Sequence, residues 1–475
     1  MNITDFKGSW VDGRYWSSAL SFSVHNPSNA QELGQLSLFT QKEIEEAIQI
    51  ASQQQQYWQQ LSPYQRSNVL EKMADLMEVH LEDLATIISL ENGKPLMESK
   101  GEVTYAISFF RWYAEEGKRI YGQIIPSHIP NLTIEKHYRP IGLCAFITPW
   151  NFPLAMLAKK IPPALAAGCS IICKPAEETP YSALALAQIS KWAGLPDGVF
   201  NVVLGNPVEI GQIFCQSPLI RKLSFTGSTP VGKILMQQAA HNLQKLSLEL
   251  GGNAPFIVCE SANISKALEG AIHSKFRNSG QACISSNRFL IHESIADVFI
   301  EELKNALSQL TVGDAFEKDS DIGPLISDKA VQKVCHLFDD AIAKGAILLF
   351  GEQPSPTQSF VQPCILTNIQ TNMALWSEEI FGPMIAITTF KSTEEALNLA
   401  NLSAHGLGSY LYSEEHSEIQ RFKMALQCGM IGINTGKISM AQAPFGGIKH
   451  SGFGREGGAD GILEYLTVHS IFEQY

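Results

Sequence analysis

The strongest constraint on the fold is the alternation of strand-like and helix-like segments that begins at Gly142. Four apolar runs have the length and composition of buried strands: 142–148, 170–175, 199–205 and 222–227. Helix-like segments fall between and after them, at 154–168, 181–194, 207–216 and 230–240. This βαβ succession predicts a mostly parallel sheet. A second alternating stretch begins near Gly252, at 254–258, 264–276, 287–293 and 295–310, and indicates a second α/β domain.

Two segments outside this alternation predict self-association. Residues 122–140 alternate and contain Pro, as in an exposed strand pair, and residues 462–475 also alternate. Strands outside both domains leave unpaired edges, and a second subunit is a common way to cover them. We therefore expect a homodimer or homotetramer. The remaining N-terminal stretch, 41–118, has helical periodicity.

Composition restricts the partners and the compartment. The net charge of −12, with no long basic run, argues against nucleic acid. No run reaches the roughly 18 to 20 apolar residues of a membrane helix, and the start MNITDFKGSW lacks the pattern of a signal peptide. We therefore expect a cytoplasmic protein without membrane contact. Nine scattered cysteines, without a CxxC pair or an HExxH motif, favour reduced thiols and no bound metal.

Cys283 is the sharpest candidate for chemistry. In FRNSGQACISSNR it lies among small and polar residues, whereas the other eight cysteines have apolar neighbours typical of packing. The thiolate is the reactive form, so a nucleophile here needs electropositive neighbours or a helix N-terminus. A buried packing role is the alternative.

Two further residues fit acid–base and oxyanion chemistry. Glu249 ends an apolar strand two residues before the pair Gly251 and Gly252, where a Glu with a raised pKa acts as a general base; a carboxylate paired with Lys or Arg is the alternative. Asn151, in FITPWNFPLAM, follows a predicted strand and has an amide that can donate to an oxyanion. A helix N-cap is the other reading of this Asn.

Cofactor-binding features also follow predicted strands. Gly227, Ser228 and Gly232 surround a helix start, where backbone N–H groups and the helix dipole favour phosphate. Lys174 and Glu177 follow another strand; a carboxylate there binds ribose hydroxyls and repels a 2′-phosphate, which favours NAD over NADP, although a solvated loop also fits. The formal GxGxxG at 452–457 has no preceding strand, so we reject it as a dinucleotide fingerprint.

Seven motifs taken together resemble the aldehyde dehydrogenase superfamily over nearly the whole chain: TPWNFP, KPAEETP, FTGSTPVG, LELGGNAP, GQAC, EEIFGP and PFGGIKHSGFGRE. The resemblance implies a Rossmann-like cofactor domain, an α/β catalytic domain and a small β oligomerisation element. The implied boundaries are 1–121 with 142–251, then 252–430, then 122–141 with 461–475, and a return segment at 431–460.

The resemblance also implies residue roles. Cys283 is the nucleophile, Glu249 the general base and Asn151 the oxyanion donor, while Lys160 and Glu456 form a supporting ion pair. The implied cofactor contacts are Thr148, Pro149, Trp150, Lys174, Glu177, Gly227, Ser228, Gly232, Leu250, Glu379 and Phe381. The implied reaction oxidises a small aldehyde through a Cys283 thioester that activated water hydrolyses.

Within the family, FRNSGQAC and NTGKIS are similar to the succinate-semialdehyde dehydrogenase branch, in which an Arg six residues before the nucleophile grips the distal carboxylate. Here that residue is Arg277, and Ser439 matches a second contact. The third contact departs from the pattern, because Lys159 stands where the branch has Arg, and Lys lacks the bidentate fork. A helix-surface ion pair is the alternative for Arg277.

The expected substrate is succinic semialdehyde first and glutaric semialdehyde second. A general aliphatic aldehyde dehydrogenase, a CoA-acylating dehydrogenase, a thiol hydrolase and a non-catalytic protein on the same fold are the competing hypotheses. Glu249 argues against the CoA-acylating enzyme, and the absence of a His from the motifs around Cys283, Glu249 and Asn151 argues against the hydrolase.

Overall fold

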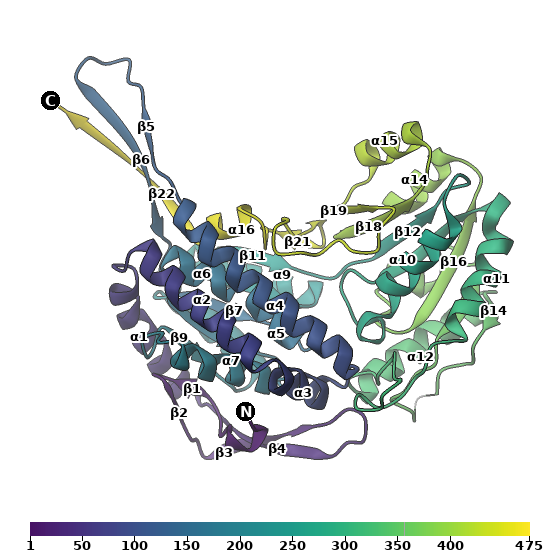
Figure 1. The fold of residues 1–475 in the computed structure, drawn as a ribbon, viewed down its shortest axis with the longest axis horizontal. Helices are drawn as coiled ribbons and strands as arrows, with labels where there is room; N and C mark the ends of the chain where they lie inside the picture. The colour runs from purple at the N-terminus through teal and green to yellow at the C-terminus, as the bar shows by residue number, and fades with distance from the viewer. Residues whose placement is uncertain (356) are drawn as a thin grey trace.

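The computed structural model (Figure 1) describes residues 1–355 and 357–475. Its first large sheet has eight strands. Five central strands are parallel, as predicted, and run in the order β9, β8, β7, β10 and β11. Antiparallel strands close both edges. The bounds are β1 Trp10–Val11, β2 Arg14–Tyr15, β7 Cys144–Ile147, β8 Ile171–Lys174, β9 Phe200–Val202, β10 Lys222–Thr226, β11 Lys245–Glu249 and β21 Gly452–Phe453.

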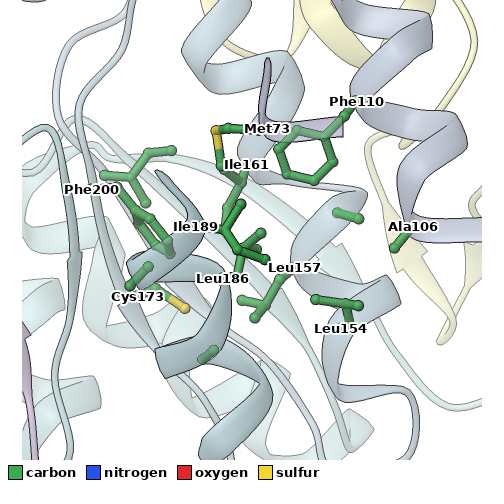
Figure 2. Close-up of a cluster of buried hydrophobic side chains, with 14 of the residues drawn as sticks. Met73, Ala106, Phe110, Leu154, Leu157, Ile161, Cys173, Leu186, Ile189 and Phe200 are labelled. Atoms are coloured by element: carbon green, nitrogen blue, oxygen red, sulfur yellow. The ribbon is translucent and has the colours of Figure 1, made fainter. Parts of the chain in front are cut away.

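Helices cover this sheet and supply its core. Figure 2 shows Met73, Phe110, Leu157, Ile189 and Phe200 together in the interior, and all five are buried. Burial of each such side chain contributes about 1.5–3 kcal/mol. The helices are α1 Gln41–Trp58, α2 Pro63–Val79, α3 Leu81–Asn92, α4 Leu96–Glu116, α5 Pro153–Ala158, α6 Ile161–Ala167, α7 Tyr181–Trp192, α8 Pro207–Gln216, α9 Thr229–Ala239 and α16 Asp460–Leu463.

The single helix predicted at 154–168 is wrong in one respect, because the structure divides it into α5 and α6. Pro162 and Pro163 have no N–H group to donate to the preceding turn, so the first helix ends and a second begins where proline is tolerated. Lys159 and Lys160 lie at the junction.

The second large sheet has seven strands, in the order β14, β15, β16, β13, β12, β18 and β19, and all neighbours are parallel except β14 and β15. Its bounds are β12 Ala254–Val258, β13 Ser286–His292, β14 Ile347–Phe350, β15 Cys364–Thr367, β16 Met384–Phe390, β18 Gly408–Tyr412 and β19 Met430–Ile433. The accompanying helices are α10 Ile264–Phe276, α11 Ala296–Leu307, α12 Asp328–Ala343, α13 Ala374–Ser377, α14 Thr393–Asn401 and α15 His416–Ala425.

A three-stranded sheet projects from the body of the molecule (Figure 1). It joins β5 Gln123–Ile125 and β6 Leu132–Pro140 to β22 Leu466–Gln474, and nine residue pairs link β6 to β22. The predicted hairpin and last strand are therefore confirmed as one sheet. Two small pairs complete the fold: β3 Leu20–His25 with β4 Glu32–Leu38, and β17 His405–Gly406 with β20 Ile448–Lys449.

The expected α/β class is confirmed. We propose the domain boundaries given above with one change: strands of the first sheet lie within 10–249 and 452–453 and those of the second within 254–433, so the second domain extends to the end of β19 at residue 433 and not to 430. Among the described residues, no helix has the length and apolar composition to cross a membrane.

Candidate active site

The carboxyl ends of the first sheet gather the candidate residues at one edge. Strand register places Ile147 beside Lys174 and Thr226 beside Glu249. A cleft of about 600 Å³ opens there, and its walls come from both large sheets and their helices. The predicted residues that line it are Pro149, Trp150, Asn151, Gly227, Ser228, Glu249, Leu250, Cys283, Glu379 and Phe381.

Cys283 lies on a strained loop between α10 and β13. Three successive residues, Asn278, Ser279 and Gly280, have positive φ angles of 49°, 59° and 81°. Such conformations are uncommon for non-glycine residues and persist where the surroundings impose them. The loop leaves Cys283 half-buried at the cleft. Burial raises the pKa of its thiol to about 12, and the Lys159 ammonium acts in the opposite direction.

Glu249 occupies the last position of β11, with its side chain buried. Neither carboxylate oxygen has a hydrogen-bond partner within the described part of the chain. Burial, and then the charge of Glu456, raises the pKa of Glu249 well above its ordinary value, while Lys160 opposes the rise. A carboxylate in this state is suited to accept a proton from water.

Backbone packing joins the Glu249 strand to the nucleophile loop. A Cβ at Gly252 would lie 2.1 Å from the carbonyl oxygen of Cys283, so only glycine permits this approach. The N–H of Gly252 also donates to Glu379 Oε1 at 2.8 Å. The sequence LELGG therefore brings the candidate base, the nucleophile loop and Glu379 together.

Asn151 lies beside the same loop, and its amide nitrogen donates to the carbonyl of Gln281 at 2.9 Å. It is not the predicted alternative, a helix N-cap, because Phe152 holds that position for α5. A side-chain amide has two N–H groups, so one donor is left for a substrate oxygen.

Lys160 and Glu456 form a buried ion pair, although 296 residues separate them. Lys160 Nζ also donates to Ser224 Oγ at 3.0 Å. Because the pair contributes opposing effects to the pKa of Glu249, it forms part of the electrostatic surroundings of that carboxylate.

Some of the predicted cofactor residues line the cleft, and others lie outside its lining. Ser228 is the N-cap of α9 and makes no capping bond with its own side chain. A Cβ at Gly232 would lie 2.4 Å from Leu250, so this glycine allows close packing of helix and strand. Thr148, Lys174, Glu177 and Gly232 lie outside the lining of the cleft. Lys174 and Glu177 form an ion pair at 2.5 Å; Lys174 is buried, so the solvated-loop alternative does not hold for it, whereas Glu177 is partly exposed.

Glu379 and Phe381 approach from the second large sheet. Burial raises the pKa of Glu379 to about 7, and the hydrogen bond from Gly252 opposes the rise. Phe381 has a positive φ of 53°, and its ring meets that of Trp150 edge-on at 5.8 Å. This ring contact therefore joins the segment that follows β7 to the segment that precedes β16 at the cleft.

The three predicted substrate residues lie beyond the lining of this cleft. The Arg277 guanidinium lies 5.1 Å from the Phe152 ring centre, and the Lys159 ammonium lies 3.1 Å from that of Phe445. Neither cation forms an ion pair with a described carboxylate, so the helix-surface pair considered for Arg277 is not observed. Ser439 Oγ lies 2.5 Å from the hydroxyl of Tyr105.

Sequence reasoning missed Tyr105 and Lys94. Tyr105 packs with Phe152 and Met156, and Met156 lines the cleft. Lys94 Nζ donates to the backbone oxygen of Asn151 at 2.8 Å. No local motif marks Tyr105, since its partner is 334 residues away. The ENGKP turn, a Lys directly after a helix-ending Gly, was the available signal for Lys94.

Comparisons with known proteins agree over nearly the whole chain. A model described as "Aldehyde dehydrogenase family" matches residues 15–471. The chain is 46% identical to a succinate-semialdehyde dehydrogenase [NADP(+)] of Escherichia coli, covering 97% of this chain and 95% of the relative. It is 44% identical to a glutarate-semialdehyde dehydrogenase of Pseudomonas aeruginosa (97% and 95%) and 44% identical to a non-phosphorylating aspartate-semialdehyde dehydrogenase of Halomonas elongata (97% and 93%).

Solved structures show the same fold. An NADP-dependent enzyme of E. coli superposes with a TM-score of 0.98 at 44% identity, covering 99% of this chain and 98% of the other. A betaine aldehyde dehydrogenase of Staphylococcus aureus in complex with NAD⁺ superposes with a TM-score of 0.95 at 32% identity, covering 98% and 95%.

Proposed function

Since the chain belongs to the aldehyde dehydrogenase family, we propose that it oxidises an aldehyde with a distal carboxylate, succinic semialdehyde first and glutaric semialdehyde second. One observation carries the substrate class: Arg277 is half-buried and Lys159 is buried, yet neither has a carboxylate partner among the described residues. Unpaired buried cations are costly and favour an anionic ligand. Because Lys159 stands where the succinate-semialdehyde dehydrogenase branch has Arg, the carbon chain of the substrate can also have the length of glutaric semialdehyde.

The cleft fits a dinucleotide. Its volume is about 600 Å³, it includes the N-terminus of α9, and the buried hydroxyl of Thr226 has no partner among the described residues. Ser228 and the first N–H groups of α9 would hold the pyrophosphate. Glu379 would accept hydrogen bonds from the hydroxyls of the nicotinamide ribose. When bound, NAD supplies the hydride acceptor at its nicotinamide ring.

The protein's own residues account for the remaining steps. Cys283 Sγ attacks the aldehyde carbon as a thiolate, an anion that the Lys159 ammonium stabilises. Asn151 Nδ2 and the backbone N–H of Cys283 donate to the oxyanion that forms. Loss of hydride from this adduct leaves a thioester on Cys283. Glu249 takes a proton from water, which attacks the thioester carbon and releases the acid and the thiolate.

We propose NAD as the preferred cofactor and NADP as the second. The Glu177 carboxylate beside the ribose would repel a 2′-phosphate, and its partner Lys174 is already paired at 2.5 Å. The E. coli relative carries NADP(+) in its name, so this preference needs its own test. Glu177→Gln should lower the ratio of kcat/KM for NAD to that for NADP, and an unchanged ratio would remove Glu177 from the assignment.

We also propose self-association through the projecting sheet. Ile124, Val468 and Phe472 are 79%, 58% and 64% exposed on it, and such apolar side chains mark an interface. Light scattering should give a dimer or tetramer, and Val468→Asp with Phe472→Asp should shift the mass toward the monomer. A monomeric wild-type protein at micromolar concentration would exclude the proposal.

The decisive experiment follows NADH formation with succinic, glutaric and aspartic semialdehydes and with butanal. The wild-type protein should prefer an acidic semialdehyde, Cys283→Ala should be inactive, and Arg277→Ala should raise KM for the acidic substrates alone. Preference for butanal would retain the dehydrogenase chemistry and remove the assigned roles of Lys159, Arg277 and Ser439.

A further inference from the structure

We propose that Lys94 is a positioning residue for the oxyanion donor, because its ammonium fixes the peptide that carries Asn151. This inference rests on the proposed role of Asn151 in the reaction. Lys94 comes from the turn between α3 and α4, and its side chain is fully buried. It touches neither the nucleophile nor the cleft, so any effect on the reaction passes through Asn151.

The contacts of Lys94 converge on one short segment. Nζ donates to the carbonyl oxygen of Asn151 at 2.8 Å and to Glu102 Oε2 at 2.5 Å. The ammonium also lies 3.9 Å from the centre of the Phe152 ring. One cation therefore contacts the backbone of Asn151 and the side chain of the next residue.

Glu102 completes the support from α4. Its Oε1 accepts from the N–H groups of Leu154 at 3.0 Å and Ala155 at 3.1 Å, at the start of α5. The carboxylate thus caps a helix that has no capping side chain of its own. Lys94 and Glu102 together hold both ends of the segment from Asn151 to the first turn of α5.

The nucleophile loop binds the same carbonyl. Asn278 Nδ2 donates to the Asn151 oxygen at 2.7 Å, while the Asn151 amide donates back to the carbonyl of Gln281 at 2.9 Å. With Lys94 as the second donor, the Asn151 carbonyl has both lone pairs engaged. Loss of Lys94 would leave one lone pair of this carbonyl unsupported, so the amide would be held against the Cys283 loop only by its bonds with Asn278 and Gln281 and would be less precisely placed.

A purely structural ion pair would not need this arrangement. Buried Lys–Glu pairs are often replaceable by apolar residues without loss of stability. Lys222 is a suitable comparison, because it is equally buried and paired with Glu464 at 3.2 Å, yet it contacts no residue of the proposed site. Lys222→Met therefore serves as a control for the removal of a buried ammonium.

The test is a double-mutant cycle on kcat/KM for the preferred semialdehyde at saturating NAD. Lys94→Met should reduce it about 10- to 100-fold, and Asn151→Ala about 100- to 1,000-fold. The combined variant should equal Asn151→Ala within about 3-fold, because the positioned group is already absent. Lys222→Met should stay within about 2-fold of wild type, and NAD affinity should be unchanged in Lys94→Met.

If Lys94→Met fails to fold, adding Glu102→Gln removes the stranded charge and keeps an oxygen for the α5 amides. Losses that multiply in the combined variant, or full activity of Lys94→Met, would overturn the assignment of Lys94. An Asn151→Ala variant with full activity would instead overturn the oxyanion role of Asn151, and the Lys94 inference with it.

Discussion

Replacing Gly252 with Ala tests the contact between the Glu249 strand and the nucleophile loop. The added Cβ would lie 2.1 Å from the carbonyl oxygen of Cys283, whereas a relaxed carbon–oxygen contact is roughly 3.3 Å. The loop or the strand must therefore move by roughly 1 Å. A displacement of this size at reacting groups costs about 100-fold in rate, so we expect kcat/KM to fall by about that factor. Overpacking should also cost about 1–3 kcal/mol of stability.

The assay is NADH formation with succinic semialdehyde, together with thermal unfolding. Gly101→Ala is the matched control: this glycine lies in α4, and its Cβ would meet no atom within 4 Å. The control should retain full activity and gain up to about 1 kcal/mol from helix propensity. Wild-type activity in Gly252→Ala would show that the loop yields without consequence, and the proposed coupling of base and nucleophile would be refuted.

Three further outcomes follow. The pKa of Glu379 is raised to about 7 by burial, so its acceptor form is lost below that pH; the Kd for NAD should rise as pH falls from 8 to 6, and Glu379→Gln should flatten this dependence in a titration of cofactor binding. Tyr105→Phe removes the hydroxyl that contacts Ser439. Initial rates should show a KM for succinic semialdehyde that is about 2- to 10-fold higher and a KM for butanal that is unchanged. Burial lowers the pKa of Lys222 from 10.5 to about 8. Between these two pH values the unfolded chain binds more protons than the folded one, so the stability of the wild-type protein should rise with pH. In Lys222→Met the increase of Tm with pH across this window should be smaller.

Periodicity and turn residues predicted much of the fold, because the pattern of apolar residues within segments such as 222–227 and 264–276 is enough to identify a buried strand or an amphipathic helix. The division of 154–168 into two helices depended on the placement of Pro162 and Pro163, which a hydrophobic pattern does not resolve. Family motifs identified residues that the structure brings to one cleft, such as Cys283 and Glu249.

The missed residues share a physical cause. Tyr105 and Lys94 obtain their roles from partners 334 and 57 positions away, Ser439 and Asn151. The ENGKP turn marks Lys94 as unusual but does not name its partner, and no local motif marks Tyr105, because both encounters are set by packing against elements formed later in the chain. The ion-pair alternative for Arg277 failed for the same reason.

The place of β21 beside β11 has a consequence for synthesis of the protein. Glu249 leaves the ribosome about 200 residues before Gly452 and Glu456, which corresponds to ~10–40 s at ~5–20 residues per second. Throughout that interval the edge of β11 is uncovered and Lys160 lacks its carboxylate. The nascent chain thus holds an incomplete centre until its final segment docks, and a chain that stops before residue 452 remains without the surroundings of its base.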